Sequence, residues 1–171
     1  MIESPLELKI LEAIQTRLLT IDAFDPYHLD FKTDNRVFIW ETNVQADEGI
    51  ALVIYSGRSV NQSDTDNPNV RRTVWSMPVM IRGFLRNADD QSITPFTAFQ
   101  CIADIKTAIR NGGTQPPFLP EQWPDADGNK LAMFTKDVAH GIEREPDSFE
   151  ITGVNVELEV IYISQKFNSY E

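Results

Sequence analysis

The chain has 171 residues, 42% of them hydrophobic and 24% charged, so it is long enough for one domain with a substantial core. Aspartate and glutamate number 26 against 15 lysines and arginines, and the net charge of −11 disfavours binding to nucleic-acid backbones and anionic membranes. The single cysteine, Cys101, excludes an internal disulfide and fits a reducing compartment. No signal peptide is expected, and the longest apolar run, Ile50–Tyr55, is too short to cross a bilayer. We therefore expect a cytosolic protein when it is made.

The first predicted element is a helix over Ser4–Ile21. Ser4 is the expected cap, Pro5 would be the first helical residue, and Glu7 would close a capping box. Asp25-Pro26 ends the segment. The apolar residues recur at helical spacing, which predicts one buried face: Leu6, Ile10, Leu11, Ile14, Leu18 and Ile21.

Two strands are predicted next, over Val37–Trp40 and Ile50–Tyr55. The second is almost continuously apolar, which is typical of a central strand covered on both faces. The polar segment Ser56–Arg71 follows, and its length and composition predict a loop that is mobile or ordered by a partner. Our hypothesis is that it is disordered in the free subunit and ordered in an assembly.

A long strand is predicted over Arg72–Leu85, where neither alternating face is fully polar. At about 3.3 Å per residue it would span roughly 45 Å, well beyond an ordinary strand, and it would need partners on both sides. Pro78 donates no backbone hydrogen bond and is expected at an edge or a bulge.

A second helix is predicted to begin at Pro95 after a Thr94 cap and to stop at Asn111-Gly112-Gly113. Its expected apolar stripe comprises Phe99, Ile102, Ala103, Lys106 and Ile109, widened by Phe96, Ala98 and Ile105. We expect both helices to pack on one face of the sheet through Leu11, Ile14, Leu18, Phe99, Ile102 and Ile109.

The remaining chain predicts one or two strands over Leu131–Arg144, a turn at Glu145–Ser148 and a long closing strand over Phe149–Ser164. Runs of strands with two helices indicate one α+β domain, residues 1–171, with a mostly antiparallel sheet and both helices on one face.

The proline-rich segment Gln115–Asn129 holds three apolar side chains, Phe118, Leu119 and Trp123. They either pack on their own domain or bury in a neighbour, and the sequence supports the two about equally. Our hypothesis is that Phe118 and Trp123 anchor a contact with another subunit, because aromatic residues on stiff loops are good interface anchors. Arg71 and Arg72, where the polar loop meets the long strand, are the other candidate contact residues.

No motif predicts a reaction, a cofactor or a metal. The two histidines, His28 and His140, lack the spacing of metal ligands, and Cys101 is interpreted as a packing residue. Asp125–Gly128 fails as a calcium loop because the flanking ligand positions are not acidic. Glu157 and Glu159 share one strand face, which is more often a solvated face than a catalytic pair. We therefore expect no catalytic residue and no enzyme.

The order of these elements, from the helix Ser4–Ile21 to the closing strand Phe149–Ser164, resembles the tail terminator proteins of long-tailed bacteriophages, also called tail completion or head–tail joining proteins. The resemblance covers nearly the full chain, in size, element order and acidity, although the insert Gln115–Asn129 is longer than the family's minimal pattern.

The resemblance implies a virion structural protein that forms a homo-oligomeric ring, commonly of six subunits, on the last ring of the tail tube. Such a ring stops tube polymerisation and presents a surface to the head connector or neck protein. It is assembled in the host cytoplasm, and DNA passes through its lumen without specific binding. The alternatives are a tail-tube or neck adaptor subunit with the same element order, and a small enzyme or non-viral binding module.

Overall fold

The computed structural model describes an α+β domain of two helices and six strands, which confirms the predicted fold class. The residues that it describes are 5–40, 50–62, 72–85, 95–111, 122–124, 127–144 and 151–165. No helix among them is long and apolar enough to cross a membrane.

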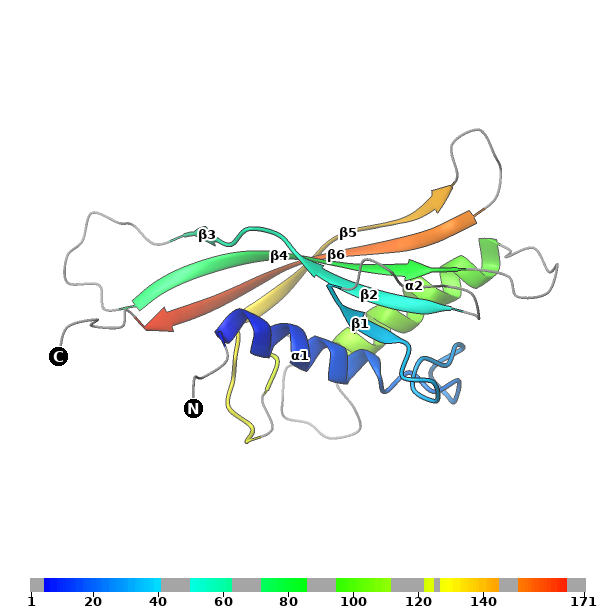
Figure 1. Ribbon diagram of the computed structural model, residues 1–171, viewed down its shortest axis with the longest axis horizontal. Helices are drawn as coiled ribbons and strands as arrows, with labels where there is room; N and C mark the ends of the chain where they lie inside the picture. Colours follow the sequence, from blue (N-terminus) through cyan, green and yellow to red (C-terminus); the bar gives the residue numbers. More distant parts are fainter. Residues whose placement is uncertain are drawn as a thin grey trace.

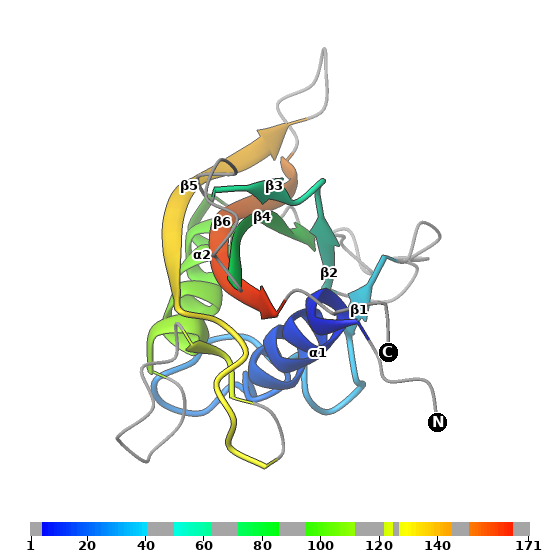
Figure 2. The same ribbon diagram turned by 90° about the vertical axis from the view of Figure 1, so that its left-hand side faces the viewer.

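One curved sheet organises the domain (Figures 1 and 2). Its strands are β1 Val37–Ile39, β2 Ala51–Ser56, β3 Val60–Asn61, β4 Arg72–Phe84, β5 Phe134–Arg144 and β6 Ile151–Gln165. The sheet order is β1-β2-β4-β6-β5, with β3 paired to β4 beside β2. The β1–β2 pair is parallel and every other described pair is antiparallel, as predicted for most of the sheet.

The long strand β4 is the centre of this sheet. It pairs with β6 along its whole length, from Arg72 opposite Gln165 to Phe84 opposite Gly153. Its other side pairs with β2 and β3, so the prediction of partners on both sides is confirmed. The prediction of a covered central β2 is also confirmed, since its first four side chains are buried.

Pro78 lies within this central strand and not on an edge strand of the sheet. Its carbonyl accepts a hydrogen bond from Gly57 N at 2.8 Å, just where β2 has ended at Ser56 and before β3 begins at Val60. The missing N–H therefore faces the break between two partner strands, where a ladder hydrogen bond is not required.

The segment Ser56–Arg71 is partly structured, which corrects the expectation of a loop throughout. Val60 and Asn61 form β3 and pair with Ser76 and Trp75 of β4. The hypothesis of partner-induced order falls mostly on residues 63–71, which lie outside the described residues.

Helix α1, Leu6–Leu18, packs on the same face of the sheet as helix α2, Pro95–Asn111. The predicted α1 stripe is confirmed, with Leu6 partly buried and the other positions buried in the common core. The predicted cap is corrected: Pro5 is the N-cap residue itself, and among the described residues no side chain caps the helix.

The Glu7 carboxylate instead ties α1 to the sheet. Its Oε1 accepts hydrogen bonds from Ser59 Oγ at 2.6 Å and from the Tyr162 hydroxyl at 2.5 Å. Tyr162 lies in β6 and is 4% exposed, so burial and the adjacent carboxylate raise the pKa of its phenol to about 12.

Helix α2 is rotated relative to the predicted stripe. Phe96 and Phe99 are 69% and 60% exposed, and Ala103 is exposed as well. The buried face consists of smaller side chains together with three isoleucines and an aspartate: Ala98, Cys101, Ile102, Asp104, Ile105, Ala108 and Ile109.

Small residues face the sheet because the helix crosses β4 at a glycine. A Cβ on Gly83 would lie 2.7 Å from Val154 Cγ2 and 3.1 Å from Cys101 Sγ. Burial also raises the pKa of the Cys101 thiol above its ordinary range, which fits the interpretation of Cys101 as a packing residue.

Asp104 fixes the connection between α1 and β1 against α2. This carboxylate is 1% exposed and accepts hydrogen bonds from the backbone N–H groups of His28 and Leu29 and from His28 Nδ1 at 2.8 Å. Because each carboxylate oxygen has a donor, the buried charge is compensated.

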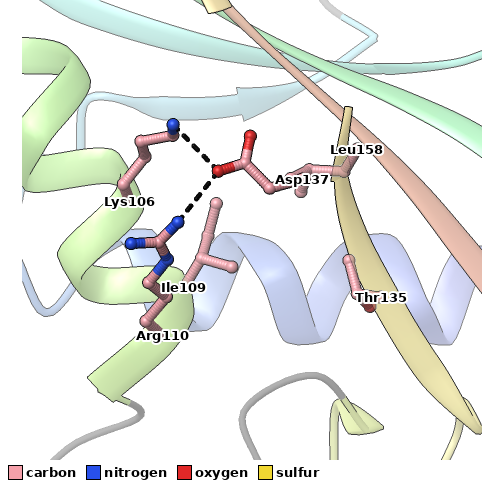
Figure 3. A pocket seen from close by; sticks show the side chains of 6 residues that line it. All are labelled: Lys106, Ile109, Arg110, Thr135, Asp137 and Leu158. Atoms are coloured by element: carbon pink, nitrogen blue, oxygen red, sulfur yellow. Dashed lines mark hydrogen bonds and ion pairs between the residues drawn. The ribbon is translucent and has the colours of Figure 1, made fainter. Parts of the chain in front are cut away.

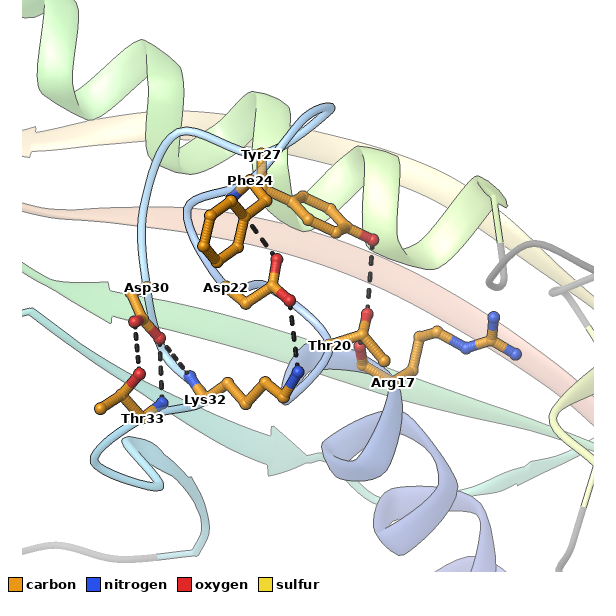
Figure 4. A network of polar contacts seen from close by, with 8 residues as sticks. All are labelled: Arg17, Thr20, Asp22, Phe24, Tyr27, Asp30, Lys32 and Thr33. Carbon is orange, nitrogen blue, oxygen red and sulfur yellow. Dashed lines mark hydrogen bonds and ion pairs between the residues drawn. The ribbon is translucent and has the colours of Figure 1, made fainter.

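Two further aspartates shape the same connection (Figure 4). Asp30 accepts from the backbone of Lys32 and from both the backbone and the hydroxyl of Thr33, while Asp22 Oδ2 receives Lys32 Nζ at 3.2 Å. Aspartate side chains commonly make hydrogen bonds of this kind to nearby groups in turns. Here the bonds stabilise the turns that lead the chain into β1.

Substitution Gly83→Ala should lower the free energy of unfolding by about 1–3 kcal/mol, because the new methyl group overpacks the contact between β4, β6 and α2. Gly141→Ala is the matched control: a Cβ there meets nothing within 4 Å, so the change should stay within about 0.5 kcal/mol. Urea unfolding of both variants measures the difference. Equal losses would contradict the close approach of α2 at Gly83.

The Tyr162 phenol should make stability fall at alkaline pH. Its pKa is raised above the ordinary value of 10, to about 12, so its contribution is complete below about pH 10 and is lost as the pH rises through 12. The stability difference between the wild type and Tyr162→Phe should therefore be constant from pH 8 to 10 and shrink by pH 11, as measured by urea unfolding. A difference that stays constant to pH 11 would show that the phenol titrates normally.

Candidate assembly surface

The candidate contact residues are not brought together in the described structure. Phe118, Leu119 and Arg71 lie outside the described residues. Arg72 is the exposed first residue of β4, opposite Gln165 at the end of the ladder. Trp123 is fully buried, with 0% exposure.

Trp123 belongs to the core of its own domain, so the hypothesis that it anchors another subunit is wrong. Its indole Nε1 donates to Thr135 Oγ1 of β5 at 2.7 Å, and its backbone carbonyl accepts from Leu131 N at 3.2 Å. Residues 122–124 and 131–133 thus lie together next to the start of β5. The apolar content of the proline-rich segment signalled a buried aromatic residue without saying which chain buries it.

The free side of β5 is the most extensive candidate contact in the described part of the chain. β5 lies at the end of the sheet order, has β6 as its described partner strand and is eleven residues long. Most of its side chains are exposed. Long edge strands are aggregation hazards unless they are paired or protected.

Apolar side chains are exposed along the same edge. Met133, Phe134 and Val138 are 43%, 39% and 58% exposed. Val138 lies where the β5–β6 register shifts between Asp137 and Ala139, and such bulges re-aim side chains at sheet edges. Apolar side chains beside free backbone groups are the features on which another strand docks.

The described strand at the opposite end of the sheet is much shorter. β1 is three residues long, and Trp40 follows it with 55% exposure, edge-on to the Tyr55 ring at 6.4 Å between centroids. The two ends of the sheet are therefore unlike, as a head-to-tail contact between copies requires.

The face of the sheet away from the helices carries ion pairs that cross three strands. Arg82 of β4 donates from Nε and Nη2 to Glu143 Oε2 of β5, at 3.0 and 2.7 Å, and Asn155 of β6 donates to Glu143 Oε1 at 2.8 Å. Arg82 also lies over the Phe84 ring, 5.0 Å from its centroid. These contacts hold β4, β5 and β6 in register.

Glu159 is held in the same way on this face. The hydroxyl of Ser76 donates to Oε1 at 2.6 Å and Lys136 Nζ to Oε2 at 2.9 Å, and these bonds lower the pKa of Glu159. Glu157 shares the face, as predicted, and is exposed. A carboxyl with a lowered pKa stays ionised near neutral pH, so Glu159 is unsuited to act as a general acid.

Within the described ranges, no three histidine, cysteine or acidic side chains gather in a way that could hold a metal ion. Arg82–Glu143–Asn155 and Ser76–Glu159–Lys136 each connect β4, β5 and β6.

Comparison of the sequence with protein-family models gives no match, and comparison with curated proteins gives none either.

Substitution Trp123→Ala should destabilise the isolated subunit by about 3–5 kcal/mol, because it empties a fully buried site and removes the donor to Thr135. Trp123→Phe keeps most of the volume and should cost less. Thermal melting of both variants is the measurement. If the melting temperature of Trp123→Ala stayed within one or two degrees of the wild type, Trp123 would not be a core residue and would again be a candidate contact residue.

Proposed function

We propose that this chain is a tail terminator subunit of a long-tailed bacteriophage. It forms a ring, commonly of six copies, on the last ring of the tail tube, stops tube polymerisation and joins the tail to the head connector. It performs no reaction and needs no cofactor. It assembles in the host cytoplasm and remains in the virion at the end of the tail nearest the head.

The observation that carries the proposal is the free side of β5. A closed ring needs one surface on each copy and a different, complementary surface on the next. β5 supplies an extended row of backbone groups with Val138 and Phe134 exposed beside it, and β1 at the other end of the sheet is short. A ring-forming subunit would keep such a long edge strand unpaired until another copy pairs with it in the assembly.

Helix α2 adds a second apolar surface on the helix-covered side of the sheet. Phe96 and Phe99, one turn apart, expose more than half of their surface. Exposed aromatic residues near one another mark protein contacts more often than isolated ones. They suit a partner other than the neighbouring copy, such as the tail-tube protein or the neck protein.

Charge supports passage of DNA through the ring. The net charge of −11 repels a phosphate backbone, the reverse of the counterion release that drives DNA binding. DNA would therefore pass through the lumen without specific binding.

The decisive measurement is mass in solution, with and without purified tail tubes, by sedimentation and electron microscopy. A terminator should remain a monomer or a discrete ring alone and should cap tube ends. Polymerisation of the chain alone would identify a tube subunit, and binding to the head connector without binding to tubes would identify a neck adaptor. A chain that does none of these would contradict the proposal.

Substitution Val138→Lys should weaken ring formation by about tenfold or more without unfolding the subunit, because a charge on a sheet edge opposes strand pairing. Val60→Lys is the matched control, since Val60 is 56% exposed against 58% for Val138 and lies on β3, which β4 and β6 separate from β5. Sedimentation equilibrium compares the two. Equal effects would contradict the role of β5 in the ring.

A further inference from the structure

A small pocket lies between α2 and β5 on the helix-covered side of the sheet (Figure 3). Its volume is about 160 Å³. The lining residues are Lys106, Ile109, Arg110, Thr135, Asp137 and Leu158.

Two cations converge on one oxygen at this pocket. Lys106 and Arg110 are four residues apart on α2 and so share a side of the helix. Lys106 Nζ lies 2.8 Å and Arg110 Nη2 lies 3.1 Å from Asp137 Oδ2 (Figure 3). Two positive charges thus face one negative charge, a local positive excess in a chain whose net charge is −11.

The Lys106 ammonium is held in place by a second contact. Its Nζ lies 3.0 Å from His140 Nδ1, and because an ammonium can only donate, the imidazole nitrogen accepts. The bulge between Asp137 and Ala139 lets Asp137 and His140 both face α2. The lysine side chain is 20% exposed, so little rotamer freedom remains to be lost on binding.

The other lining side chains are two buried apolar residues and one threonine. Ile109 and Leu158 are 6% and 3% exposed, and the Thr135 side chain is held by the hydrogen bond from the Trp123 indole. A partly dehydrated wall strengthens the attraction between a cation and an anion.

The size of the pocket limits what it can take. Sites for drug-sized ligands occupy about 300–1,000 Å³. A pocket of about 160 Å³ is too small for a nucleotide and accommodates one oxyanion group.

We propose that this pocket binds a single oxyanion, a phosphate or a carboxylate, through Lys106 and Arg110. Asp137 occupies the cations in the free protein and is displaced from them by the ligand. The oxyanion is either a free ion or an acidic side chain on a second copy of this chain, which carries 26 such residues. The site does not depend on the proposed function.

Titration with inorganic phosphate, followed by amide chemical shifts of the folded protein at low ionic strength, tests the proposal. The wild type should show saturable shifts at residues 106, 110 and 137. Asp137→Asn removes the competing charge and should tighten binding by about tenfold. Lys106→Gln and Arg110→Gln should each weaken it about tenfold, and Arg110, at 65% side-chain exposure, can be replaced without risk to the core.

The matched controls use the Lys136–Glu159 pair, which has a similar distance of 2.9 Å but lies on the other face of the sheet. Lys136→Gln and Glu159→Gln should leave phosphate binding unchanged. The proposal is overturned if neither the wild type nor Asp137→Asn binds phosphate, or if Lys136→Gln weakens binding as much as Lys106→Gln does.

Self-association distinguishes the two sources of the oxyanion. If an acidic side chain of a second copy occupies the pocket, Arg110→Gln should lower the association constant in sedimentation about tenfold, and acetate should compete with association. If the ligand is a free ion, Arg110→Gln should lose phosphate binding while its self-association equals that of the wild type.

Discussion

The β4–β6 ladder is the constraint on which the rest of this structure depends. Thirteen consecutive residues of β4 pair with β6. The face on which each side chain of β4 lies therefore determines the face on which its partner in β6 lies. On one face this register aligns Val79 with Leu158 and Ile81 with Val156, and these pairs belong to the core that the two helices share with the sheet. A shift of one residue would turn the whole apolar set toward the uncovered face, which carries Arg82 and Glu159.

The helices meet this ladder by different means. α1 combines its apolar stripe with a hydrogen bond from Tyr162 to the Glu7 carboxylate, which gives a packed helix a fixed position along β6. α2 approaches where Gly83 leaves room, so its small residues face the sheet and its phenylalanines remain outside. The exposed aromatic surface on α2 is thus a consequence of close packing on the opposite side of the helix.

The ladder also determines where contacts with other chains can form. It occupies one side of β4 and one side of β6. β2 and β3 pair with the other side of β4, and β5 pairs with the other side of β6 and has no second partner strand among the described residues. The bulge at Asp137 gives β5 two functions in our proposals. It directs Asp137 and His140 toward the cations of α2, and it exposes Val138 at the edge.

Local patterns in the sequence were sufficient for both helices, for the strands other than β3, and for the α+β class, the buried stripe of α1, the central place of β2 and the alternation of β6, because periodicity reports which face of an element is buried. They were insufficient for the rotation of α2, since Phe99 and Cys101 both fall at helical spacing and only the contact with Gly83 selects between them. The burial of Trp123, the place of Pro78 opposite a strand break and the convergence of Lys106 and Arg110 on Asp137 each join segments distant in sequence. Tertiary structure decided these because a single segment does not specify its partner.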